Sequence, residues 1–181
     1  MLGKISRIVR NPMNVLDSIV RMVSFRIFDH TNYRRFIVLS RSRTGSSLLI
    51  SYLHSHPNVT AQGEIFARLD GRKAGVMLSN VFCKQPLYIK ASGFKIFYYH
   101  PVDDDTREIW PLLVKAKDLH VIHLKRRNIL RTLISRKIAE LQDSWNVTDS
   151  EMPDRGHPKQ ITIEKDEVED LVTQTRQCSI V

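Results

Sequence analysis

The feature that most constrains the fold is a short apolar run followed at once by small and basic residues and then by a second apolar run. Residues 35 to 40 (RFIVLS) are apolar and β-branched, as in buried parallel strands. Residues 41 to 47 (RSRTGSS) predict a turn, and residues 48 to 53 (LLISYL) predict a helix that Pro57 ends. Strand, small-residue turn and helix, in that order, indicate a layered α/β fold.

The same order recurs further along the chain. Residues 93 to 99 (GFKIFYY) and 120 to 124 (HVIHL) predict two more strands, and the basic turn 125 to 128 (KRRN) follows the second. We expect residues 129 to 141 to form a helix, residues 143 to 160 to form a loop, and residues 163 to 174 to form an acidic helix. We therefore expect an α/β fold of three layers, with a mainly parallel sheet and helices on both faces.

The composition excludes several classes of protein. A chain of 181 residues with 42% hydrophobic side chains fits one soluble domain with its own core. Its two cysteines, Cys83 and Cys178, cannot form a disulfide framework. The sequence contains neither a CxxC nor an HExxH pattern, so we expect no metal site.

The net charge of +9 comes from 28 basic and 19 acidic side chains and is unevenly distributed. Residues 1 to 46 carry nine basic and two acidic side chains, residues 115 to 137 carry eight and one, and residues 138 to 181 carry four and ten. This balance indicates an anionic partner such as nucleic acid, a membrane surface or a phosphorylated small molecule. The two basic stretches either converge on one anion or form unrelated solvated faces, and on charge alone we favour the second arrangement.

We expect residues 1 to 34 to form a basic amphipathic N-terminal segment. Between residues 2 and 28, apolar side chains recur at near-helical spacing with arginines between them, and Pro12 interrupts the pattern. Charges recur too often for a membrane span or a signal-peptide core, so we expect a cytoplasmic protein. The segment either packs on its own domain, which we favour, or makes peripheral contact with an anionic membrane surface.

Each strand-to-helix turn suits one phosphate group. Ligands of open α/β sheets bind beyond the carboxyl ends of the strands, where helix N-termini offer free N–H groups. In the first turn Gly45 permits close approach, Ser46 and Ser47 supply hydroxyl donors, and Arg43 supplies a charge.

In the second turn Arg126 and Arg127 can grip another phosphate in bidentate fashion, with Ser135 further along the helix. The first turn lacks the GxxxxGK[ST] spacing of a Walker A loop, which disfavours an ordinary ATPase or kinase. The acidic residues 103 to 105 are expected to form a turn rather than a Mg²⁺ site. A metal-independent anion site fits this sequence better.

Several motifs occur in the same order as in a known family, between residues 35 and 140. They are residues 37 to 49 (IVLSRSRTGSSLL), 55 to 59 (SHPNV), 63 to 66 (GEIF), 93 to 96 (GFKI), 121 to 131 (VIHLKRRNILR) and Ser135. Together they resemble the sulfotransferases that use 3′-phosphoadenosine 5′-phosphosulfate (PAPS). The nearest branch is that of bacterial carbohydrate sulfotransferases of the Nod-factor type.

The resemblance implies a P-loop-like fold in which residues 35 to 181 bind PAPS as co-substrate without a metal. Arg43 stands at the family's catalytic lysine or arginine, and the residues from Thr44 to Ser47 line the 5′-phosphate. Glu64 matches the acid that takes the proton from the acceptor hydroxyl, which the resemblance places on a carbohydrate or glycolipid.

The 3′-phosphate pair of the family maps to Arg127 and Ser135. On one straight helix these residues would lie about 12 Å apart, so Arg127 must fold back from the turn. Arg126 and Arg131 are the alternative ligands for the 3′-phosphate.

Members of this family usually continue with a further strand, a helix and a basic segment, whereas this chain stops at Val181. The alternatives are a truncated product, a minimal enzyme, or a non-catalytic homologue that binds PAPS or its product, adenosine 3′,5′-bisphosphate (PAP). A nucleic-acid or membrane-surface binder is the less favoured function, and we expect no nucleic-acid partner.

Overall fold

The computed structural model describes residues 29 to 141 and 160 to 177. The predicted amphipathic segment 2 to 28 and nearly all of the predicted loop 143 to 160 lie outside these ranges. The described elements are β1 (Asp29–His30), β2 (Arg34–Ser40), α2 (Ser46–Ser55), β3 (Val59–Gln62), α3 (Ala74–Val81), β4 (Gln85–Pro86), β5 (Ala91–Phe97), α4 (Ile109–Lys115), β6 (Leu119–His123), α5 (Ile129–Leu141) and α6 (Lys165–Gln177).

Four parallel strands form the central sheet in the order β3-β5-β2-β6. The register places Ile37 of β2 opposite Phe94 of β5 and Val121 of β6. β1 and β4 form a separate antiparallel pair. The three strands predicted from the sequence are confirmed, with ends that shift by no more than a few residues, and the first of them lies at the centre of the sheet.

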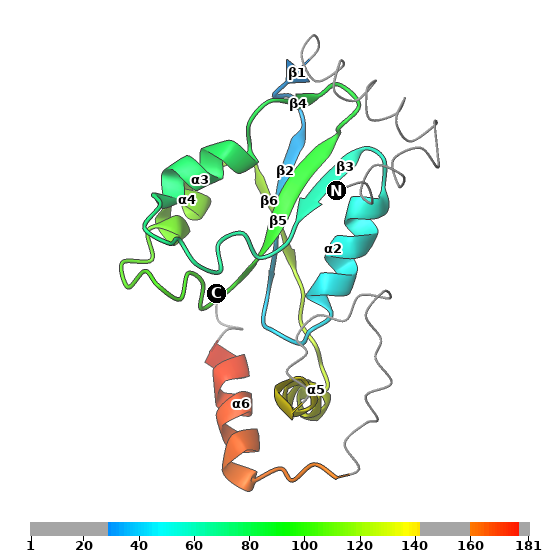
Figure 1. The fold of residues 1–181 in the computed structure, drawn as a ribbon, viewed down its shortest axis with the longest axis vertical. Helices are drawn as coiled ribbons and strands as arrows, with labels where there is room; N and C mark the ends of the chain where they lie inside the picture. The colour runs from blue at the N-terminus through cyan, green and yellow to red at the C-terminus, as the bar shows by residue number, and fades with distance from the viewer. Residues whose placement is uncertain (1–28, 142–159, 178–181) are drawn as a thin grey trace, which may run out of the picture.

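Helices cover both faces of this sheet, as predicted (Figure 1). Side chains alternate along β2, so Phe36 and Val38 pack with Ile50 of α2 on one face. Ile37 lies on the other face, in a larger cluster with residues of α3 and α4. The result is a mixed α/β arrangement compatible with three layers.

Five short elements were not predicted, namely β1, β3, α3, β4 and α4. β3 has four residues, two of them polar, and its apolar Ala61 is buried against α2. α3 buries Ala74, Met77 and Val81, which recur at helical spacing, but no side chain caps its N-terminus. α4 has seven residues. Such elements form because tertiary packing covers them, with little local signal.

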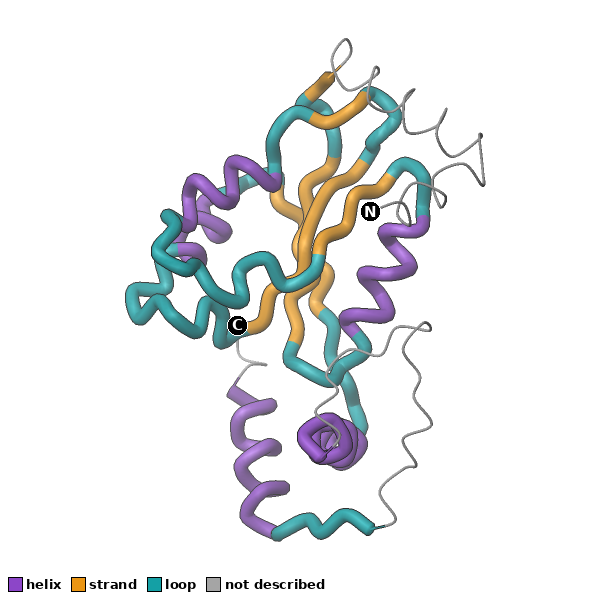
Figure 2. Tube along the Cα trace, in the orientation of Figure 1, coloured by secondary structure: helices purple, strands orange, loops and turns teal. Residues whose placement is uncertain are grey.

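α5 and α6 lie beyond the carboxyl ends of the strands (Figure 1). α5 has the predicted bounds, and α6 begins two residues after the predicted start. Figure 2 shows that the loops after β2 and β6 come together at this end of the sheet. Within the described ranges, no helix has the length and apolarity needed to cross a bilayer.

Candidate anion-binding and active site

The loop between β2 and α2 bends sharply at two residues with positive φ. Arg43 has φ 62° and Gly45 has φ 94°, and α2 begins at the next residue, Ser46. No side chain caps the first turn of α2, so its N–H groups remain available at the positive end of the helix dipole. A Cβ at Gly45 would meet no heavy atom within 4 Å. This part of the loop therefore offers an open cradle of backbone donors.

The side chains of this loop have different surroundings. Thr44 Oγ1 donates to the Arg41 carbonyl at 2.8 Å, which stabilises the bend. Ser46 is buried, whereas Ser47 is exposed. Only part of the predicted 5′-phosphate loop therefore presents side-chain hydroxyls to solvent.

The two basic turns converge in the structure. Arg43 Nε donates to Ser135 Oγ at 2.9 Å, joining the loop after β2 to α5. Arg126 Nη1 donates to the Arg43 carbonyl at 3.0 Å. The arrangement favoured on charge alone, with two unrelated faces, therefore does not hold for these turns.

The predicted 3′-phosphate residues, Arg127 and Ser135, are not hydrogen-bonded to each other in this structure. Ser135 accepts its hydrogen bond from Arg43 rather than from Arg127. Arg127 is exposed and forms no hydrogen bond or ion pair with the rest of the described chain. Of the two alternative ligands, Arg126 is half-buried against the loop and Arg131 is exposed.

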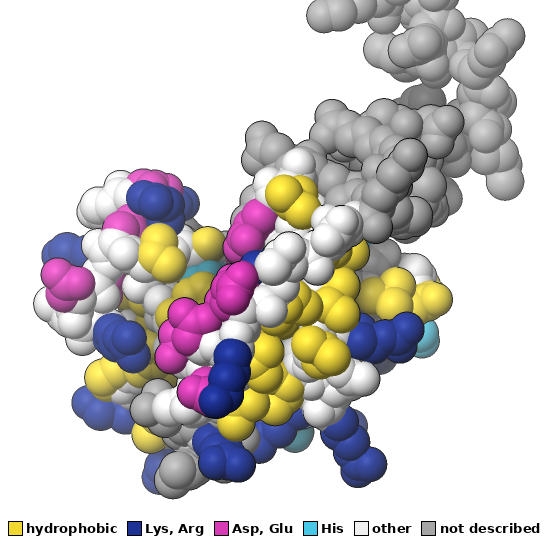
Figure 3. All heavy atoms as spheres, turned by 90° about the horizontal axis from the view of Figure 1, so that it is seen from below, with side chains coloured by type: hydrophobic (Ala, Val, Ile, Leu, Met, Phe, Trp, Pro, Cys, Tyr) yellow, Lys and Arg dark blue, Asp and Glu magenta, His cyan; other side chains and the backbone are white. Residues whose placement is uncertain are grey.

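Arg41 connects the loop to α6. Its guanidinium donates to Gln174 Oε1 at 2.6 Å and to Thr175 Oγ1 at 3.1 Å. Figure 3, which views this end of the molecule, shows a row of acidic side chains with lysines and arginines beside it. α6 thus contacts the loop through polar side chains.

A small pocket opens between the ends of β2, β5 and β6 and the helices α5 and α6. It is lined by Arg41, Thr44, Tyr98, His123, Leu124, Lys125, Arg126, Ile129, Thr132, Leu171 and Thr175. The Tyr98 hydroxyl is hydrogen-bonded to His123 Nε2. Burial, aided by the nearby Lys125 charge, lowers the pKa of His123 and favours its neutral form.

Glu64 lies in the loop that follows β3 and contacts a buried lysine. Lys95 Nζ lies 2.8 Å from Glu64 Oε1 and donates to Ser47 Oγ at 2.7 Å. The Lys95 side chain is 6% exposed and that of Glu64 is 32% exposed. The acid predicted to be the base and a hydroxyl of the anion loop therefore share one ammonium group.

His100 lies on the other side of the Glu64 carboxylate, with its Nε2 3.8 Å from Oε2. Its Nδ1 accepts the Phe97 N–H at 3.3 Å. Burial lowers the pKa of His100, and the positive charge of Lys95 acts in the same direction while Glu64 opposes them. His100 is consequently a neutral neighbour of Glu64 at neutral pH.

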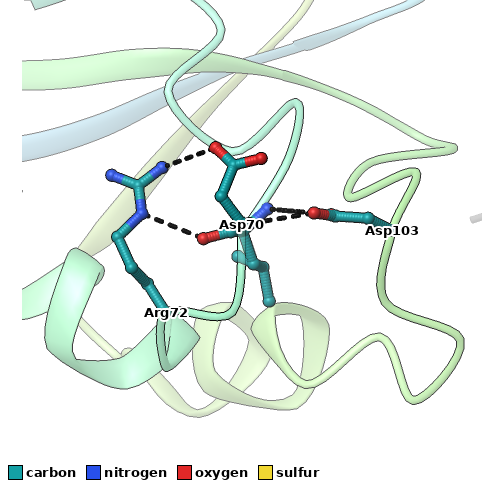
Figure 4. A network of polar contacts seen from close by, with 4 residues as sticks. Asp70, Arg72 and Asp103 are labelled. Atoms are coloured by element: carbon teal, nitrogen blue, oxygen red, sulfur yellow. Dashed lines mark hydrogen bonds and ion pairs between the residues drawn. The ribbon is translucent and has the colours of Figure 1, made fainter.

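Asp103 fixes the end of the loop that carries Glu64. Its carboxylate accepts the Asp70 N–H at 2.9 Å and the Leu69 N–H at 2.8 and 3.0 Å, and Arg72 pairs with Asp70 at 3.2 Å (Figure 4). These backbone donors lower the pKa of Asp103. The expected turn at residues 103 to 105 is confirmed, and it serves to hold this loop.

Sequence reasoning did not single out Lys95 or Arg41. Lys95 is the one charged residue in the apolar run 93 to 99, and a charge inside a buried strand needs a partner. That signal was available, although it does not name Glu64 or Ser47. Arg41 gave no signal beyond its place next to the turn.

No group of three or more His, Cys, Asp or Glu residues in the described chain is placed to hold a metal ion. Comparisons of the chain with protein-family models, curated proteins and solved structures found no match.

Proposed function

We propose that this protein is a sulfotransferase that transfers the sulfuryl group of PAPS to a hydroxyl acceptor, with carbohydrates as the acceptor class. The observation that carries the proposal is the hydrogen bond between Arg43 and Ser135. It joins the first turn to α5, and Arg126 of the second turn donates to the Arg43 carbonyl beside it, so the segments that the sequence assigns to the two phosphate sites of one nucleotide lie together. These turns follow β2 and β6, which are neighbours in the sheet.

The position of the turns supports nucleotide binding. Within the sheet, β5 and β3 lie to one side of β2 and β6 lies to the other, so the strand order reverses at β2. Crevices of this kind, where the strand order reverses, are the usual ligand sites of open α/β sheets. The open backbone at Gly45 and the uncapped first turn of α2 fit a phosphate group there.

The residues of the site divide the chemistry between them. The acceptor oxygen attacks sulfur, the bond from sulfur to the bridging phosphate oxygen breaks, and the nucleotide leaves as PAP. Arg43 and the N–H groups of the loop stabilise the negative charge that grows on the bridging oxygen. Glu64 takes the proton of the acceptor hydroxyl.

Recognition of the 3′-phosphate is assigned to the second turn. Arg127 is exposed and free to turn toward an anion, while Arg126 already contacts the loop. Ser135 can exchange its bond with Arg43 for a phosphate oxygen. This 3′-phosphate contact distinguishes PAPS from ATP.

Binding is tested by calorimetric titration of PAP and of AMP, which lacks the 3′-phosphate. Arg43→Ala should weaken PAP binding about tenfold to a hundredfold, the loss expected for charge-assisted hydrogen bonds to phosphate. The matched control is Arg34→Ala, because Arg34 is exposed at the opposite end of the same strand. Equal affinity for PAP and AMP, or steeply salt-dependent binding of duplex DNA in place of PAP, would contradict the proposal.

Transfer is tested with radiolabelled PAPS and a panel of glycans. Glu64→Gln should lower turnover by about 10²- to 10⁴-fold and leave PAP affinity nearly unchanged. Binding of PAP by a folded protein that transfers nothing would identify the non-catalytic homologue instead. Unchanged turnover in Glu64→Gln would remove Glu64 from the mechanism.

A further inference from the structure

Lys95 is the one lysine or arginine among the buried residues of the described chain. It lies in the middle of β5, opposite Val38 of the central strand. Its ammonium also lies 5.5 Å from the centre of the Phe97 ring. Burying a charge costs desolvation free energy, so the groups that Lys95 contacts indicate what its charge is for.

Those contacts join three segments that are distant in the sequence. The ammonium reaches Ser47 in the first turn of α2 and Glu64 in the loop after β3. The backbone N–H of Lys95 also donates to the Gly63 carbonyl at 3.3 Å, so Lys95 holds the Glu64 segment through both main chain and side chain. Because one nitrogen contacts both side chains, the oxygens of Ser47 and Glu64 stay within reach of the same point.

We infer that Lys95 is a positioning residue that sets the distance between the anion loop and the Glu64 carboxylate. The inference rests on the proposed function, in which the loop holds the donor and Glu64 takes the acceptor proton. Lys95 acts through these two groups and does not touch the substrate, because its side chain is almost fully enclosed. Its strand is part of the rigid sheet, which makes it a better reference point than a loop residue.

A structural role alone would give a different pattern of effects. A lysine that only stabilises the core would alter stability in every variant, independently of Glu64. A lysine that acts through Glu64 loses its influence on turnover once Glu64 can no longer take a proton. The two roles are therefore separated by a double-mutant cycle.

The first arm measures turnover in Lys95→Met, Glu64→Gln and the double variant. Lys95→Met alone should lower kcat about tenfold or more and change KM for PAPS by less than about threefold. In the double variant, Lys95→Met should lower kcat by less than about twofold beyond the effect of Glu64→Gln. Lys95→Arg, which keeps the charge, should restore part of kcat. Lys90→Met is the control, because Lys90 is exposed just before β5. Effects that multiply in the double variant would overturn the inference.

The second arm needs no turnover and uses folded protein that retains Lys95. The ¹⁵Nζ resonance of Lys95 should shift in Glu64→Gln and in Ser47→Ala, and again when PAP is added to the unsubstituted protein. If the Lys95 resonance shifts in neither variant although the enzyme is active, the positioning role is overturned and the proposed function stands. A protein that neither binds PAP nor transfers a sulfuryl group overturns the proposed function, and the effect on turnover with it.

Discussion

Replacing Leu171 with alanine should release α6 from the anion loop while leaving the sheet intact. Leu171 is 3% exposed, and two hollows border it, one of which is also lined by the buried Leu133 of α5. Truncation of a buried leucine to alanine costs about 2 to 5 kcal/mol. We expect a loss of about 2 kcal/mol, because the neighbouring hollows allow the side chains around the site to relax.

The loss should appear as local opening. α6 has 13 residues, and an isolated helix of that length is marginal in water. Its other contacts include the hydrogen bonds from Arg41 and the ion pair of Glu167 with Lys137 at 2.7 Å. A change of about 2 kcal/mol raises the open population roughly 30-fold, so the backbone amides of α6 should exchange with deuterium about 30-fold faster.

Hydrogen exchange followed by mass spectrometry reads this directly from peptides that cover α6 and β5. Leu141→Ala is the matched control, because Leu141 is 65% exposed and its truncation should leave exchange unchanged. Equal acceleration in the α6 and β5 peptides would show that α6 unfolds only with the whole domain. Unchanged exchange in α6 would show that Leu171 does not hold it.

Two further predictions concern stability. Gly93→Ala should disrupt the pairing of β2 with β5 and sharply lower the melting temperature, because its Cβ would lie 2.1 Å from the Phe36 carbonyl oxygen. Gly75→Ala is the control and should leave the melting temperature unchanged, because its Cβ meets only Leu112, at 3.7 Å. Equal melting temperatures of the two variants would contradict this reasoning. Because burial lowers the pKa of His100, the unfolded chain binds its proton first, so the free energy of unfolding should fall as the pH drops below about 6.5. Urea unfolding at several pH values checks this: His100→Gln should flatten the dependence, and an equal effect of His54→Gln, at an exposed position, would refute it.

The sequence predicted the fold best where the local signal and the tertiary role agree. β2 is apolar because both of its faces are covered, and that burial gives the continuous run seen in residues 35 to 40. The helix of α5 was predicted with its observed bounds because a basic turn precedes it and its periodicity is sustained. β3 was missed because half of its four residues are polar, so only its pairing with β5 defines it.

The candidate site was predictable in part. The turns after β2 and β6 were chosen because ligands bind at the carboxyl ends of parallel strands, and adjacent strands bring those ends together. The partner of Ser135 was not predictable from spacing along α5, since Arg43 arrives from a turn 92 residues away. The side-chain pairing depends on how α5 is placed beyond the sheet, which no local pattern encodes.

The partners of Lys95 could not be predicted from the sequence near it. A lysine within an apolar strand must find a partner, because an unpaired ammonium in the interior is strongly unfavourable. The sequence offers many acids, and none is adjacent to it. The parallel register of β3 and β5 carries the chain past Gln62, opposite Phe94, to Gly63 and Glu64 beside Lys95, and only then is the choice of partner determined. The buried charge is thus a consequence of sheet order, which is why its partners had to be found from the structure.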